Sequence, residues 1–120
     1  MLKTKLFFSA AILWTSTITF LSIATLGDIG ASVPIANKDK YVHFTFYFVF
    51  VLLWVSYFKT KNANSNNRWK VLVVAICFGI FMEICQGLFT TTRTPDIFDV
   101  LANSAGAVFG LIVITRIYKK

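Results

Sequence analysis

The chain has 120 residues, of which 57% are hydrophobic and 17% aromatic, while only 14% carry a charge. A soluble domain of this length cannot bury so much apolar surface, because a small fold leaves a large share of its surface exposed. The formal net charge of +7 does not indicate nucleic-acid binding, because the basic residues form no stripe that alternates with exposed aromatic side chains. Composition therefore indicates one integral membrane domain, residues 1–120, with no nucleic-acid partner.

The first predicted helix covers residues 6–26, an uncharged segment long enough to cross a hydrocarbon core of about 30 Å. Lys3 and Lys5 precede it. A cleaved signal peptide begins in a similar way, and Ser22 and Ala24 are small residues near a possible cleavage site, but its apolar part is usually shorter. We therefore expect a helix that the mature protein retains.

Three further apolar segments follow, at residues 41–58, 71–89 and 96–117. Pro34 lies in the loop before the second helix, and Asn37 can cap that helix. The Asn-rich basic segment 59–70 is the next connection, and residues 90–94 form a tight one before the last helix. Thr94-Pro95 is a typical helix start, with Thr as the N-cap. Because lipid offers no partners to open backbone groups, we predict an all-α membrane protein, a four-helix transmembrane bundle.

The basic residues predict the orientation of the bundle. If the N-terminus lies in the cytoplasm, nine of the twelve Lys and Arg residues fall on the cytoplasmic side and three fall outside. The positive-inside rule therefore predicts that both the N- and C-termini are cytoplasmic.

Polar residues interrupt the last three helices, and the predicted topology brings them to one depth. His43 lies near the start of the second helix, Glu83 near the end of the third, and Asp99 near the start of the fourth. Because these helices alternate in direction, the three residues fall in the same leaflet, which the predicted orientation makes the outer one. Ionisable groups inside a membrane are costly, so they indicate a functional site.

The polar residues also share helix faces at spacings of three or four residues. These faces are Asp39, His43 and Tyr47 on the second helix, Gly79, Glu83, Gln86 and Thr90 on the third, and Asp99, Asn103, Gly106 and Gly110 on the fourth. Gly106 and Gly110 form a GxxxG pair, so we expect them to serve in close helix packing. Three polar stripes can thus face one another inside the bundle.

Three segments of the chain resemble the VanZ-like family of small bacterial membrane proteins. They are DKYVHFTFYF at 39–48, MEICQ at 82–86 and RTPDIFDVLANSAGAVFG at 93–110, and they match the family pattern in order. The resemblance covers residues 38–110. It implies a multi-pass protein of the bacterial inner (cytoplasmic) membrane, and the family's namesake is linked to resistance to the glycopeptide teicoplanin.

The leading hypothesis is an outer-leaflet pocket that binds an amphiphile: a lipid headgroup, a lipid-linked precursor or a lipoglycopeptide. Such a protein has an accessory role in envelope maintenance or in glycopeptide resistance. The expected ligand-binding residues are Asp39, Lys40, His43, Glu83, Gln86, Arg93, Asp96, Asp99 and Asn103. Among them, Arg93 and Lys40 suit a phosphate or carboxylate, and Gln86 and Asn103 suit sugars or amides.

Two other functions remain open. An intramembrane enzyme would use His43 as general acid or base, with Glu83 or Asp99 as its partner, on a lipid-linked phosphate or ester. A small proton-coupled transporter would use the same groups as a relay, although four helices leave little room for a path unless the protein forms a homo-oligomer. The sequence favours a binding protein over an enzyme.

Purely structural interpretations of the polar residues also remain open. Asp96 can serve only the dipole of its helix, Gln86 and Asn103 can form hydrogen bonds between helices, and His43 can pair with Asp39. Arg93 can extend to the lipid headgroups or pair with Asp96 or Asp99.

We expect no cofactor and no metal. Cys77 and Cys85 lie in one apolar segment without a His or Asp at a metal-binding spacing, so they are expected to pack as small apolar groups. A divalent ion held by Glu83, Asp96 and Asp99 is chemically reasonable, but Arg93 disfavours it.

Overall fold

The computed structural model describes residues 2–23, 38–62, 66–89 and 97–119. Within these ranges the chain forms four helices and no strand: α1 (Leu2–Ile23), α3 (Lys38–Lys61), α4 (Arg68–Phe89) and α5 (Ile97–Lys119). Each helix is long and apolar enough to cross a membrane. The prediction of an all-α four-helix membrane bundle is therefore confirmed.

Several helix ends lie beyond the predicted segments. α3 begins at Lys38 and ends at Lys61, and α4 begins at Arg68, so the helices include basic residues that hydropathy assigned to connections. Long basic side chains can extend to the headgroups from a helix end, so charge does not stop the helix there. Pro34, Asn37 and residues 90–96, including the predicted helix start at Thr94-Pro95, lie outside the described residues.

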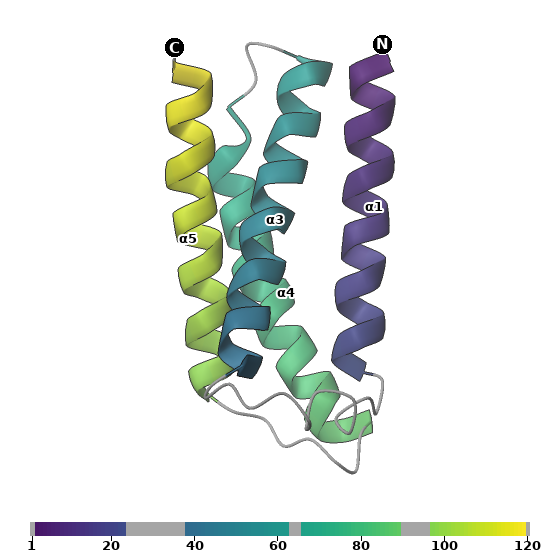
Figure 1. Ribbon diagram of the computed structural model, residues 1–120, viewed down its shortest axis with the longest axis vertical. Helices are drawn as coiled ribbons and strands as arrows, with labels where there is room; N and C mark the ends of the chain where they lie inside the picture. Colours follow the sequence, from purple (N-terminus) through teal and green to yellow (C-terminus); the bar gives the residue numbers. More distant parts are fainter. Residues whose placement is uncertain (1, 24–37, 63–65, 90–96, 120) are drawn as a thin grey trace.

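The helices lie side by side along the long axis of the bundle (Figure 1), which measures 45 Å. The first turn of α1 and the last turn of α5 lie at the same end of the bundle, as an even number of spans requires. The end of α3 and the start of α4 lie at this end too. Which end faces the cytoplasm stays a prediction from the positive-inside rule.

The pair α3 and α5 is packed most closely, and glycine is the reason. A Cβ atom at Gly106 would overlap the backbone carbonyl of Phe44, and one at Gly110 would lie 2.9 Å from the carbonyl oxygen of Phe48. One face of α5 therefore touches the backbone of α3 directly. This contact brings the start of α3 and the start of α5 together, and both carry polar side chains.

Most of the rest of the interior is apolar, although the polar residues Ser22, Ser56 and Gln86 are buried too. Buried side chains of all four helices, among them Ile18, Val51, Ala75 and Ile114, form one hydrophobic cluster. α1 lies at the side of this core and is joined to α3 by two tryptophans. The Trp14 indole N–H donates to the Phe46 carbonyl at 2.8 Å, and the Trp54 indole N–H donates to Thr15 Oγ1 at 3.1 Å.

Candidate functional site

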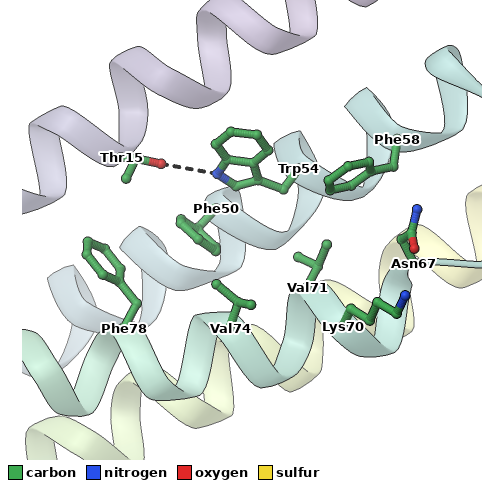
Figure 2. Close-up of a pocket in the computed structure, with 9 residues that line it drawn as sticks. All are labelled: Thr15, Phe50, Trp54, Phe58, Asn67, Lys70, Val71, Val74 and Phe78. Carbon is green, nitrogen blue, oxygen red and sulfur yellow. Dashed lines mark hydrogen bonds between the residues drawn. The ribbon is translucent and has the colours of Figure 1, made fainter.

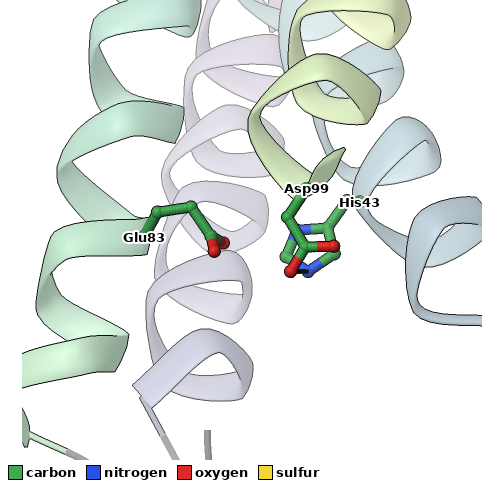
Figure 3. Close-up of side chains that lie close together, drawn as sticks. All are labelled: His43, Glu83 and Asp99. Atoms are coloured by element: carbon green, nitrogen blue, oxygen red, sulfur yellow. Dashed lines mark ion pairs between the residues drawn. The ribbon is translucent and has the colours of Figure 1, made fainter. Parts of the chain in front are cut away.

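Five polar side chains from three helices lie together at the end of the bundle opposite the first turn of α1 and the last turn of α5. We call them the polar cluster: Lys40 and His43 of α3, Glu83 of α4, and Asp99 and Asn103 of α5. Four of these residues are buried; counted over the whole residue, the exposed fractions are 6% for His43, 3% for Glu83, 7% for Asp99 and 2% for Asn103. Figure 3 shows that Glu83 points toward His43 and Asp99 from across the bundle. A buried group of this kind inside membrane-spanning helices is the main candidate for a site.

Asp99 connects the two basic side chains of the cluster. Lys40 Nζ donates to Asp99 Oδ1 at 2.6 Å, and His43 Nε2 lies 3.6 Å from Asp99 Oδ2. Lys40 and His43 are three residues apart, so they lie on one face of α3. Asp99 lies in the first turn of α5, where its negative charge also favours the positive end of the helix dipole. One carboxylate is thus held between an ammonium and an imidazole.

The second ring nitrogen of His43 contacts Asn103. His43 Nδ1 lies 3.0 Å from Asn103 Oδ1. Because an amide oxygen only accepts hydrogen bonds, this contact favours the tautomer with the proton on Nδ1. His43 Nε2, which faces Asp99, is then the nitrogen that can take up or release a proton. The imidazole is oriented from both sides, as a histidine that exchanges protons or binds a ligand requires.

Space for the Asn103 side chain comes from Gly79 on α4. A Cβ atom at Gly79 would lie 3.0 Å from Asn103 Nδ2 and 3.1 Å from Asn103 Cβ. Within the described part of the chain, Asn103 Nδ2 and the Tyr47 hydroxyl are buried without a hydrogen-bond partner. A buried donor without a partner is costly, so a ligand or water that accepts from these groups would lower the free energy of the site.

The cluster also contains a set of possible metal ligands. His43, Glu83 and Asp99 each offer one ligand atom, and these three atoms lie within 4.8 Å of one another. One imidazole and two carboxylates form a donor set that suits divalent ions such as Zn²⁺ or Mn²⁺. The Lys40 ammonium already neutralises Asp99, so a metal ion would compete with it for the carboxylate. The expectation of no metal therefore stays a prediction.

The structure describes the side chains of six of the nine expected ligand-binding residues. The structure brings Lys40, His43, Glu83, Asp99 and Asn103 together, and Gln86 is buried one turn along α4 from Glu83. Arg93, Asp96 and the side chain of Asp39 lie outside what the structure describes, and so do the pairings expected for them. That the grouped residues bind a ligand stays a prediction.

Two features of the site were not predicted from the sequence. Lys40 was expected to hold a ligand anion, but its ammonium contacts Asp99. The sequence carries no signal for this pair, because GxxxG spacing marks a closely packed face of α5 but not the helix that it contacts. Tyr47 was placed on the polar face of its helix but not among the site residues, although the residue is only 1% exposed.

The profile of the VanZ/LLP1 family matches residues 4–118, which is nearly the whole chain. The chain belongs to the VanZ/LLP1 family. The match includes α1, which lies outside the three segments that carry the resemblance in the sequence. It confirms the expected family, but it does not identify a ligand or a resistance role.

This VanZ/LLP1 chain is also similar to an uncharacterized protein of the yeast Schizosaccharomyces pombe. The two are 27% identical over 103 residues, which are 86% of this chain and 62% of the yeast protein. The chain thus spans about three fifths of the length of that curated relative. No solved structure matches the chain significantly.

Proposed function

We propose that this VanZ/LLP1 protein binds the polar headgroup of a membrane amphiphile at the polar cluster, as a binding protein of the cell envelope. The observation that carries the proposal is a cluster of five polar side chains, four of them buried, at one end of a mostly apolar bundle. Such a group is costly in lipid unless it has a function. With the predicted orientation, the bound headgroup belongs to the outer leaflet of the cytoplasmic membrane.

The depth of the cluster suits a headgroup. His43 lies five residues after the start of α3 and Glu83 six residues before the end of α4, which correspond to rises of about 8 and 9 Å. The cluster thus lies in the outer part of the spanning segments, where the headgroup region meets the hydrocarbon. Lys40, whose side chain is 25% exposed, lies nearest to the surface. An amphiphile can reach the cluster with its headgroup while its tails stay among the lipids.

The chemistry of the cluster suits a headgroup that both donates and accepts hydrogen bonds. The carboxylates of Glu83 and Asp99 accept from hydroxyl or ammonium groups, while Lys40 and the Asn103 amide donate to phosphate or carbonyl oxygens. The yeast relative favours a phospholipid over a lipid-linked wall precursor or a lipoglycopeptide, because yeast cell walls contain no peptidoglycan. The ligand we favour is therefore a glycerophospholipid headgroup with hydroxyl or amino groups.

Native mass spectrometry of protein extracted from its own membranes tests the proposal. We expect a lipid to co-purify with the wild type, and Glu83→Gln to lower its occupancy by about tenfold, because a hydrogen bond to a charged group contributes about 1.5–3 kcal/mol. Ser56→Ala, which changes a buried polar residue far along α3 from the cluster, is the matched control and should keep the lipid. Equal occupancy in the wild type and Glu83→Gln would contradict headgroup binding at this site.

The orientation of His43 supports a second candidate, an intramembrane enzyme acting on a lipid ester or phosphate. His43 lies between Asp99 and Asn103, and Glu83 offers a second carboxylate within 4.8 Å. These are the parts that a general acid–base catalyst needs.

If the protein is an enzyme, purified protein should convert at least one member of a phospholipid panel. His43→Gln should then lower turnover by about 100-fold or more, the usual contribution of a positioned acid or base. Chromatography of the lipid products provides the measurement, with Ser56→Ala again as the control. No product from any lipid in the panel would leave headgroup binding as the function.

A proton-coupled transporter is the third candidate, and the described interior offers it little support. Between the polar cluster and the opposite end of the bundle, Phe50, Val51, Val55 and Ile114 fill the space between α3, α4 and α5. A proton path through one copy would have to cross this apolar layer. Transport would therefore need a path along an interface between copies in a homo-oligomer.

A further inference from the structure

The other half of the bundle contains a groove between α1, α3 and α4. Its volume is about 560 Å³, within the range of sites that hold small molecules. Figure 2 shows the side chains that line it, and we call this surface the groove. They are Thr15, Phe50, Trp54, Phe58, Asn67, Lys70, Val71, Val74 and Phe78.

The groove is apolar along its length and polar at one end. Trp54 brings a polar atom to the wall, but its indole N–H donates to Thr15 Oγ1, so the ring presents hydrocarbon surface. Asn67 and Lys70 lie at the start of α4, and Figure 2 shows both at one end of the groove, away from Phe78. This is the shape of a site for a molecule with a long apolar part and a polar end.

The length of the groove matches one leaflet of a membrane. Lys70 and Phe78 are eight residues apart on one helix, which corresponds to a rise of about 12 Å. Half of a hydrocarbon core of about 30 Å is close to this length. An acyl chain that follows the groove from Phe78 thus has its headgroup at the level of Lys70.

The basic side chains at this end of the bundle favour a lipid with an anionic headgroup. Every charged side chain that the structure describes there is basic: Lys3, Lys5, Lys59, Lys61, Arg68, Lys70 and Arg116. The described carboxylates Glu83 and Asp99 lie at the opposite end. The positive-inside rule accounts for a surplus of basic residues, but it does not account for an apolar groove that ends at a lysine.

We propose that the groove binds an acyl chain of an anionic phospholipid, with the lipid phosphate at Lys70. The lipid belongs to the leaflet at which the first turn of α1 and the last turn of α5 lie. This site is separate from the polar cluster, which lies at the other end of the bundle. A result that contradicts one proposal therefore leaves the other unaffected.

The first test adds dioleoyl phosphatidylglycerol or dioleoyl phosphatidylcholine to the detergent-purified full chain and measures bound lipid by native mass spectrometry. We expect tighter binding of phosphatidylglycerol. Val74→Trp should weaken it by about tenfold or more, because the indole displaces several methylene groups of the acyl chain. Val73→Trp is the matched control, since Val73 and Val74 are 59% and 56% exposed but only Val74 lines the groove. Equal loss in both variants, or equal affinity for both lipids, would overturn the proposal.

A second pair of variants tests the headgroup contact without changing the apolar part of the groove. Lys70→Gln should weaken phosphatidylglycerol binding by about fivefold, the effect of one basic residue near an anionic surface. Arg116→Gln removes an equal charge from the same end of the bundle, but Arg116 does not line the groove, so its affinity should stay within about twofold of the wild type. Equal losses for Lys70→Gln and Arg116→Gln would indicate a diffuse surface charge and overturn the site.

Discussion

Gly106→Ala is expected to destabilise the bundle by about 2 kcal/mol, although alanine is the better helix former. The added Cβ atom would overlap the carbonyl of Phe44, which belongs to the backbone of α3 and cannot turn away. Alanine gains at most about 1 kcal/mol over glycine in a helix, whereas overpacking costs about 1–3 kcal/mol and more where rigid backbone must move. Unfolding in mixed micelles with increasing dodecyl sulfate measures the free energy.

Ala105→Leu is the control for Gly106→Ala. Ala105 is exposed on α5, so a much larger side chain there meets lipid and should leave the stability within about 0.5 kcal/mol of the wild type. Gly110→Ala should fall between the two, because its Cβ atom would lie 2.9 Å from the Phe48 carbonyl oxygen. If Gly106→Ala were as stable as Ala105→Leu, α3 and α5 would not touch at this glycine.

The helices and the depth of the polar residues could be predicted from the sequence because lipid permits few backbone structures. Backbone groups must be paired within each span, so apolar segments of membrane length become helices. Helices that alternate in direction then bring His43, Glu83 and Asp99 to one level. The GxxxG spacing similarly indicated which face of α5 packs closely, since only glycine lets two backbones touch.

The pairing of the side chains could not be predicted in the same way. Sequence spacing places Lys40 and His43 on one face of a helix, but it does not determine which of several acidic residues they reach. The rotation of α3 against α5 decides this, and it brings Lys40 to Asp99 and His43 to both Asp99 and Asn103. The groove could not be predicted from the sequence for a related reason. It exists because α1 and α4 leave a space between them beside Trp54, and sequence spacing does not determine the distance between two helices.

Lys40→Met is expected to destabilise the protein by about 3 kcal/mol, and Asp99→Asn by about 1 kcal/mol. The exposed fractions of the two side chains, 25% for Lys40 and 9% for Asp99, explain this asymmetry. Removing Lys40 leaves a buried carboxylate without its ammonium partner, and breaking a buried pair in this way costs about 3–5 kcal/mol. Removing Asp99 leaves an ammonium that can extend to the headgroups, which costs little.

The double variant Lys40→Met/Asp99→Asn separates this explanation from a simple loss of contact. If the cost of Lys40→Met comes from the uncompensated carboxylate, then Asp99→Asn removes that cost, and the double variant should be about 2 kcal/mol more stable than Lys40→Met alone. Dodecyl sulfate unfolding of the four proteins measures the coupling. Additive losses would show that the two side chains act separately, and that the charge of Asp99 does not depend on Lys40. The expected rescue would instead show that Lys40 holds a negative charge in place beside His43, which is the electrostatic condition that a headgroup site at the polar cluster requires.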